Sequence, residues 1–540
     1  MLDALEARDL IRREPMSRVE GDREFNFKHI LIREVAYATL PRASRRERHA
    51  AVAKYLEQQV GDTPDLAWFL AHHWREAGEY AKAVEYLVAA AERAQHAFAK
   101  DEAIALFDDA IELSEDPADR DRVRLIRAFS LLDLADFEAA AQEFDDLLPH
   151  LDGEAKIDAL IGRTRAGIWT EEFDVALTMA ERARELAEQA GDDERTAPAI
   201  GYLCGVQTMT GKVDDSIAHG EEALRRWIPG TRGSDFAAVH EFLADSYYWA
   251  GGYARAEELA RAAHEIGGSM HNVNALMRGG GWRGVALAGL GRTEDSMTLL
   301  DLMIETAERI GRPRFAAPSL NYSTQNFRDL YLLDEARSRN ERALEIVGRE
   351  GEYGMPGMQG RIDLLITDLM QGDVGRVERE WPKLWDEAIN GSAWRPWLGG
   401  CRLAFIRAER ARHADRPEAT VEAAADAIER AQRIHRRKYA EMSRIILGEA
   451  LVALGRTDEG IAELEAAVAG ADALGTPSLR WQHRVALGRT RYATGDDDGA
   501  ASAYAEAADV IRGYAATLTP EHAASFLGAE PVRDALSTAG

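Results

Sequence analysis

The chain has few cysteines, few basic residues and no long apolar run. Only Cys204 and Cys401 occur among 540 residues, so neither a disulfide framework nor a thiolate metal site is indicated. No apolar run approaches the roughly 20 residues that a membrane-spanning helix needs, and the first residues carry charges where a signal peptide needs its apolar segment. We therefore predict a cytoplasmic protein with no membrane contact.

Basic side chains are outnumbered by acidic ones, with 66 Lys and Arg against 93 Asp and Glu and a formal net charge of -27. Such a surface repels nucleic acid, because duplex binding depends on neutralising phosphates with Lys and Arg. Residues 1–50 differ, since they hold 11 basic and 9 acidic side chains. Nucleic acid is not an expected partner, and the two ends of the chain are chemically unlike.

Motifs of known chemistry are also missing. The nearest approach to a phosphate-binding loop runs from Gly205 to Lys212-Val213, and it has one residue too many and no hydroxyl after the lysine. His72 and His73 are adjacent, so they cannot form the metal-binding pair that lies one helical turn apart. We predict no catalytic residue, no cofactor and no metal.

A repeated segment is what the sequence does contain. A small residue opens the second helix of each unit, at Ala83, Ala103, Ala140, Ala176, Ser216, Ala256, Ser296, Ala336, Val377, Thr420, Gly460 and Ala500. We call these the marker residues. From Ala176 onward they follow one another at steps of 40 to 43 residues. Unrelated connections vary in length, so this regularity predicts one unit repeated, in about 12 helical hairpins with a 40-residue period.

Two further positions complete the unit. Twelve residues before many markers lies a second small residue, at Ala71, Ala128, Cys204, Ala244, Gly284, Ala408, Gly448 and Gly488. Helices approach closely only where facing side chains are small, so these positions predict the crossing point of each hairpin. One helical turn after the marker stands a large residue, as at Leu87, Phe107, Phe144, Leu300, Leu464 and Tyr504.

This pattern resembles the tetratricopeptide repeat, which has small residues at its eighth and twentieth positions and a large apolar one at its twenty-fourth. The departure is length, because about 34 residues are typical of that repeat. The resemblance implies an all-α fold, a tetratricopeptide-like helical-hairpin solenoid.

The N-terminal segment differs from the repeats. Residues 16–25 predict two short strands around a Gly21-Asp22 turn, followed by a helix, as at the end of a winged-helix fold. The next residues are similar to the junction that follows the nucleotide-binding module of bacterial signalling ATPases of the STAND type, including adenylyl-cyclase-linked and maltose-activator-like members. The similarity rests on Phe25, Phe27, His29, Leu31, Arg33, Glu34, Ala36, Tyr37, Arg45 and His49. Residues 514–536 resemble the ending of those proteins.

These features divide the chain into three parts. We predict a winged-helix-like junction remnant at residues 1–60, the solenoid at 61–513 and a C-terminal capping segment at 514–540, which should shield the apolar face of the last hairpin.

Four tryptophans fall within 17 residues. Trp381 stands at the large position of its repeat and Trp385 lies one helical turn later, which favours core packing. Trp394, Arg395 and Trp397 are the candidate partner-binding patch, because Trp and Arg dominate binding hot spots. Core packing remains the alternative for them too.

The leading functional prediction is a non-catalytic regulatory scaffold or sensor, which binds protein partners or a small effector in a helical-repeat groove. One alternative is the C-terminal sensor half of an ATP-dependent switch whose ATPase domain lies upstream or is separately encoded. A second alternative is a transcription regulator that uses the N-terminal remnant.

Overall fold

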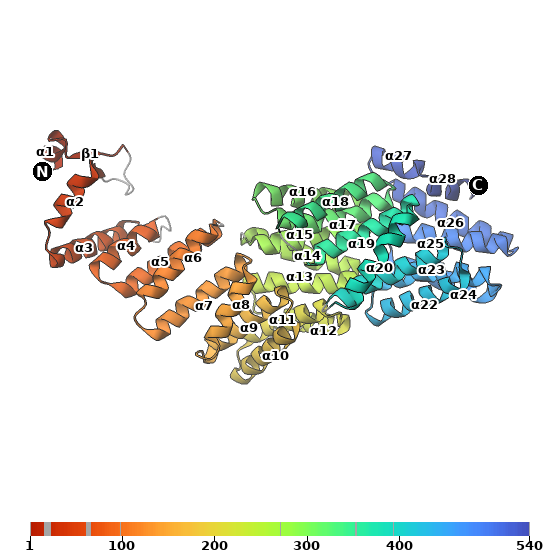
Figure 1. The fold of residues 1–540 in the computed structure, drawn as a ribbon, viewed down its shortest axis with the longest axis horizontal. Coiled ribbons are helices and arrows are strands. Elements are labelled where there is room, and N and C mark those ends of the chain that lie inside the picture. The colour runs from red at the N-terminus through yellow and green to blue at the C-terminus, as the bar shows by residue number, and fades with distance from the viewer. Residues whose placement is uncertain are drawn as a thin grey trace. The chain divides into compact units, whose positions relative to one another are not determined.

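The computed structural model describes residues 2–15, 23–60, 66–97, 99–270, 272–350, 354–391 and 394–538. The chain forms two compact units, Met1–Ala166 and Gly167–Gly540. Figure 1 shows that successive helices lie side by side in the second unit and from α3 onward in the first. Among the described residues, no helix combines the length and the apolar character needed to cross a bilayer.

The first unit contains a strand pair near the N-terminus, but its strands differ from those predicted within residues 16–25. Strand β1 (Ile11–Arg13) pairs antiparallel with β2 (Phe25–Phe27), with Ile11 opposite Phe27. The first strand thus lies ahead of residues 16–25, and the predicted Gly21-Asp22 turn lies outside the described residues. The helices are α1 (Leu2–Ala7), α2 (Ile30–Ala38), α3 (Arg42–Val60), α4 (Ala67–Ala77), α5 (Tyr80–His96), α6 (Lys100–Leu113), α7 (Pro117–Asp133), α8 (Phe137–Leu147) and α9 (Gly153–Trp169), whose last turn belongs to the second unit.

The second unit is helical throughout its described residues. Its first helices are α10 (Phe173–Ala190), α11 (Asp193–Met209), α12 (Val213–Arg226), α13 (Gly233–Trp249), α14 (Tyr253–Ser269), α15 (Val273–Gly289), α16 (Thr293–Arg309), the short 3-10 helix η2 (Pro313–Phe315), α17 (Ala316–Asp329) and α18 (Leu333–Glu350). The others are α19 (Gly354–Gln371), α20 (Val374–Ile389), the π-helix η3 (Arg395–Gly399), α21 (Gly400–His413), α22 (Pro417–Arg433), α23 (Arg437–Ala453), α24 (Thr457–Leu474), α25 (Pro477–Ala493), α26 (Asp497–Ala515), α27 (Pro520–Gly528) and α28 (Glu530–Thr538).

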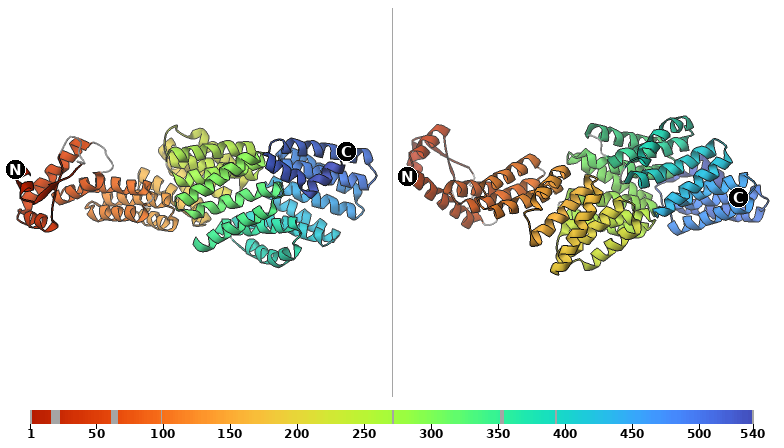
Figure 2. Two further views of the ribbon diagram at one scale, coloured as in Figure 1. Left: turned by 90° about the horizontal axis from the view of Figure 1, so that it is seen from above. Right: turned by 60° about the horizontal axis from the view of Figure 1, so that its bottom comes forward.

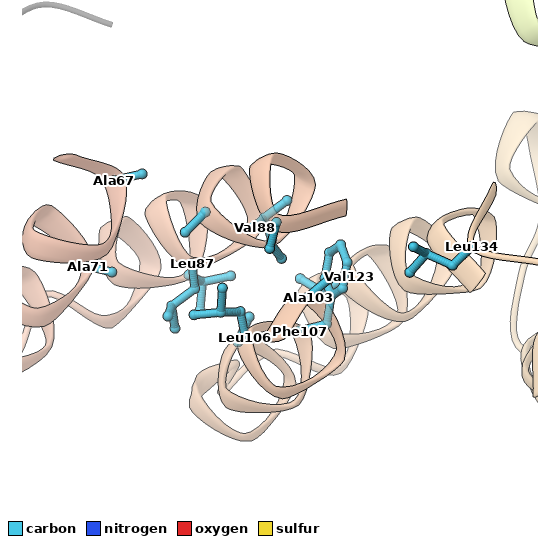
Figure 3. Close-up of a cluster of buried hydrophobic side chains, with 14 residues drawn as sticks. Ala67, Ala71, Leu87, Val88, Ala103, Leu106, Phe107, Val123 and Leu134 are labelled. Carbon is cyan, nitrogen blue, oxygen red and sulfur yellow. The ribbon is translucent and has the colours of Figure 1, made fainter. Parts of the chain in front are cut away.

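The repeat pattern is confirmed residue by residue. All twelve marker residues are buried, and the hairpins cross where small residues were predicted. Ser296 Oγ donates to the carbonyl oxygen of Gly284 at 2.7 Å, twelve residues back. In the first unit, side chains of α4 to α7 interlock in the same way, with Leu87 and Phe107 buried between helices (Figure 3). The fold is therefore the predicted tetratricopeptide-like helical-hairpin solenoid.

The turns inside the hairpins share one backbone conformation. The residue five places before the marker has a positive φ, at Gly78, Ala135, Glu171, Gly211, Gly251, Gly291, Tyr331, Gly372, Asp415, Gly455 and Gly495. Glycine suits this left-handed conformation, whereas other residues adopt it at a cost. At Glu171 the side chain offsets that cost by contacts described below.

The close crossing of α23 and α24 gives a stability prediction. A Cβ atom on Gly448 would lie 2.8 Å from the carbonyl oxygen of Gly460 and 2.7 Å from Leu464. Since the oxygen belongs to the backbone, Gly448→Ala must push α23 and α24 apart. We expect the free energy of unfolding in urea to fall by about 1–3 kcal/mol.

A matched control lies on α26. A Cβ on the exposed Gly513 meets no atom within 4 Å. Gly513→Ala should therefore keep or raise stability, by up to about 1 kcal/mol from helix propensity. Equal stability of the Gly448→Ala and wild-type chains would contradict the close crossing.

The second unit curls so that distant hairpins meet. Trp397 Nε1 donates to the carbonyl oxygen of Met209 at 2.9 Å across 188 positions, and Thr476 Oγ1 donates to that of Gly289 at 2.7 Å across 187. Further along, Thr293 and Tyr514 share a 2.6 Å hydrogen bond. The unit is thus a superhelix whose successive turns are in contact, and in Figure 2 the green helices adjoin the blue ones.

Helices α27 and α28 pack against the last hairpin and the neighbouring superhelical turn. Phe526, Val532 and Ala535 are buried in one cluster with Ile511 of α26 and Leu330, which follows α17. Glu294 of α16 also accepts hydrogen bonds from the backbone of Thr519 and from His522, both at 2.8 Å. The apolar end of the superhelix is therefore covered.

Candidate functional site

A cavity of about 60 Å³ lies inside the superhelix of the second unit, and it is partly open. Helices α13 to α15, α17, α19, α21 and α23 contribute to its lining, together with Arg436, which directly precedes α23. Its cationic residues are Arg328, Arg402, Arg436 and Lys438, and its aromatic ones are Tyr248, Trp249, Tyr253, Tyr322 and Tyr439. The site exists because superhelical curvature brings α13 next to α23.

One carboxylate organises part of the cavity wall. Asp363 of α19 is buried and accepts from Arg402 at 2.6 Å and from Arg328 at 2.9 Å through the same oxygen. Arg402 also donates to the hydroxyl of Tyr439 at 2.9 Å. Burial opposes the charge of Arg402, but Asp363 outweighs burial, so the pKa of this guanidinium is raised. These residues form a hydrogen-bonded group in which two guanidinium groups share one carboxylate.

Arg436 has a different environment. It is 1% exposed, and one terminal nitrogen donates to the carbonyl oxygen of Leu398 at 3.1 Å. Its guanidinium lies 3.8 Å from the ring centre of Trp249, a stacking arrangement that arginine favours. Burial lowers the pKa of Arg436 from its usual value.

Lys438 stands two residues further along the same helix. Burial lowers the pKa of its ammonium group to about 8, and Asp329 opposes that effect. Burial in turn raises the pKa of Asp329, and it raises the pKa of Asp245 to about 8. At neutral pH Asp245 is therefore mostly uncharged and neutralises little of the nearby positive charge.

The predicted patch of Trp394, Arg395 and Trp397 contacts the chain itself. Trp394 is 2% exposed and donates to Glu171 at 2.8 Å, and Arg395 pairs with the other oxygen of Glu171 at 2.7 Å. Trp397 makes the bond to Met209 described above. The structure brings the three residues together at a contact between superhelical turns, and their role towards a separate partner stays a prediction.

Trp381 and Trp385 lie within a hairpin, as core packing predicts. Trp381 is 9% exposed and donates to the carbonyl oxygen of Leu403 at 2.8 Å. The two rings are stacked with their centres 5.1 Å apart.

The two cysteine thiols are buried, and the acidic side chains of the described residues form no metal site. Both cysteines are free and buried, and burial raises the pKa of Cys204 to about 12. Such thiols remain protonated and unreactive at neutral pH. Across the part of the chain that the structure describes, no group of three or more His, Cys, Asp or Glu residues could hold a metal ion.

The first unit contains a cluster of histidines. His49 of α3 lies 2.8 Å from His73 of α4, Nδ1 to Nδ1, and its other nitrogen lies 2.9 Å from the hydroxyl of Tyr37. Glu76 and His72 also act on this pair. Burial is the main cause that lowers the pKa of His73 to about 4, and His49 adds to the effect.

This cluster predicts a pH dependence. The unfolded chain protonates an imidazole near pH 6.5, whereas folded His73 does so only near pH 4, so protons favour unfolding. Its contribution is complete above pH 6.5 and is lost as the pH falls towards 4. Because His73 is only half-buried, we expect about 1–2 kcal/mol after allowing for solvent screening.

The measurement compares unfolding in urea at pH 7.5 and 4.5. The loss of stability on acidification should be smaller for His73→Gln than for the wild-type chain. The exposed His96 is the control, and His96→Gln should behave as wild type. An unchanged pH response of His73→Gln would disprove the effect.

Sequence reasoning missed the residues of the cavity. The run His435-Arg436-Arg437-Lys438-Tyr439 leads into the first turn of α23, and a basic run at a helix end is typical of a solvated surface. The available signal was its place in the repeat, since it connects one hairpin to the next, between α22 and α23.

No profile of a known protein family matches the sequence. No curated protein matches it either. Solved structures give remote likenesses. One is the sensor-bearing signal transduction ATPase with numerous domains from Pyrococcus horikoshii, at 14% identity over 71% of this chain and 58% of that one, with a TM-score of 0.48. The sensor of that ATPase is a tetratricopeptide repeat.

Two others are the apo quorum sensor NprR from B. thuringiensis, at 12% identity over 66% of this chain and 99% of that one with a TM-score of 0.47, and the Cut9–Hcn1 hetero-tetramer of APC/C, at 14% identity over 94% and 98% with a TM-score of 0.45. None of these likenesses bears on what the cavity holds.

Proposed function

We propose that the chain is a non-catalytic regulatory sensor whose second unit binds a small effector inside its superhelix, in the cytoplasm. The observation that carries the proposal is the cavity between Trp249, Asp363 and Arg436, where polar and charged side chains face inward. Buried charges are costly and poorly suited to a purely structural core. Convergent polar groups in an otherwise buried cavity favour ligand binding.

The position of the cavity supports a regulatory role. Its wall includes Trp249 from one superhelical turn and Arg436 from the next, and these two side chains stack. A ligand that prefers one spacing of the turns would shift the chain towards that spacing. Protein partners that bind outer surfaces of the solenoid would then sense the effector.

A ligand screen tests the proposal. The purified chain is melted in the presence of small molecules and short peptides, and a ligand at 100 times its Kd should stabilise it by about 2.7 kcal/mol. Gln325 lines the cavity, so Gln325→Trp should abolish these shifts by filling it. Ala501→Trp places the same ring on an exposed position of α26 and should preserve them. Shifts that survive Gln325→Trp would refute the cavity as the binding site.

A second candidate function is the sensor half of an ATP-dependent switch. Apolar side chains on α2 of the first unit favour this function, because Ile30, Leu31 and Val35 are each more than 60% exposed. A contiguous exposed apolar face is typical of an interaction surface, and the resemblance of residues 25–49 implies an ATPase domain as its occupant. An in-frame phosphate-binding motif in the DNA upstream of Met1, or an adjacent gene encoding one, would support this. Its absence from both would count against it.

A further inference from the structure

Arg436 is a buried cation whose hydrogen-bonding capacity is mostly unused. Its Nε and one terminal nitrogen are fully buried and have no hydrogen-bond partner among the described residues. A guanidinium removed from water normally pairs with a carboxylate, yet this one lies against the rings of Trp249, Tyr439 and Trp397 and donates once, to the Leu398 carbonyl. The stacking holds its planar fork in a fixed orientation at the cavity wall.

The surrounding carboxylates do not supply the missing partner. Asp363 is already shared by Arg328 and Arg402, and the raised pKa of Asp245, about 8, leaves it mostly protonated at neutral pH. Asp329 is the acid that acts most on Lys438, but within the described residues Lys438 makes no hydrogen bond or ion pair. The cavity therefore carries excess positive charge inside a protein with a formal net charge of -27.

The size of the cavity limits what can balance that charge. About 60 Å³ is well below the approximately 150 Å³ of a cavity that holds a benzene ring. A carboxylate or phosphate group matches this space, whereas a bulky body does not. The rest of a ligand would extend through the open side of the cavity.

We propose that Arg436 and Lys438 bind the anionic group, carboxylate or phosphate, of a small effector. The inference rests on the proposed function and names the chemical class of its ligand. The Nε–H and terminal N–H of Arg436 donate in parallel to two oxygens of the anion, which is the geometry that guanidinium groups offer. Lys438 adds a point charge, and the tyrosines around the cavity offer hydroxyl groups.

Isothermal titration calorimetry on the full chain tests this site with three probes at equal ionic strength. Inorganic phosphate and acetate represent the two anionic groups, and acetamide is the neutral control. We expect at least one anion to bind and acetamide not to bind. Arg436→Gln and Lys438→Gln should each weaken binding of the anion at least tenfold. Whether phosphate or acetate binds identifies the anionic group. Arg437→Gln, a charge loss at the exposed neighbour, should leave binding unchanged.

Several outcomes would overturn the inference. Failure of both anions to bind the wild-type chain would do so, and so would equal binding of all three probes or full affinity in Lys438→Gln. If Arg436→Gln does not fold, Lys438→Gln decides the matter, because that side chain has no bond to lose. The anion site can fail while the proposed function holds. A neutral compound whose binding is lost in Gln325→Trp but kept in Arg436→Gln would uphold the sensor and refute the anion site.

Discussion

Asp363→Ala is expected to lower the free energy of unfolding of the second unit by about 3–5 kcal/mol, the usual effect of removing one partner of a buried ion pair. The change leaves Arg402, which is 5% exposed, without its carboxylate and removes the same partner from Arg328. The penalty comes from uncompensated buried charge more than from a lost attraction. Urea unfolding followed by circular dichroism measures it.

An exposed ion pair provides the control. Asp301 pairs with Arg339 at 2.6 Å, and its side chain is 44% exposed. Asp301→Ala removes the same charge, but water can replace the contact, so the expected loss is below about 1 kcal/mol. Similar losses for the two variants would show that Asp363 is not the organising carboxylate of the cavity wall.

Trp394→Ala is expected to destabilise the contact between superhelical turns by about 3–5 kcal/mol, as removal of large buried aromatics generally does. The variant empties the space of a ring that is 2% exposed and removes one of two donors to Glu171. Trp397→Ala should act in the same direction, because it removes the bond to Met209. Hydrogen exchange at the start of α10 should become faster in both variants.

Tyr492→Ala is the matched control, since Tyr492 is 69% exposed in the same unit. Its effect should stay within about 0.5 kcal/mol. If Trp394→Ala and Trp397→Ala keep the stability and exchange rates of the wild-type chain but lose a partner, the three-residue patch is a recognition site and the contact to Glu171 is incidental.

The hairpins could be predicted from the sequence because their contacts are local. A marker such as Ser296 meets Gly284 twelve residues away, and the same spacing recurs from unit to unit, so every repeat restates the prediction. Burial of all marker residues confirms it. Repetition supplied the evidence that a single helix pair could not.

The candidate site could not be predicted in this way. Trp249 and Arg436 meet only because the stack curves through nearly 190 residues, and curvature is the sum of small rotations that no residue pattern states. Trp394 shows the same limit. A tryptophan at this position indicated a buried contact, but its residue type could not tell whether the contacting surface belongs to a partner or to Glu171 of the same chain.

The regularly spaced contacts between superhelical turns restrict how many repeats this chain can gain or lose. Solenoids ordinarily lengthen and shorten by whole repeats, since each repeat meets only its neighbours. Here Gly211, Gly251 and Gly291 advance in step with Trp397, Arg437 and Pro477, which lie against them. Duplication or loss of one repeat between Gly291 and Trp397 would preserve every hairpin yet shift all three contacts out of register, so the repeat number in this stretch is fixed by the superhelix.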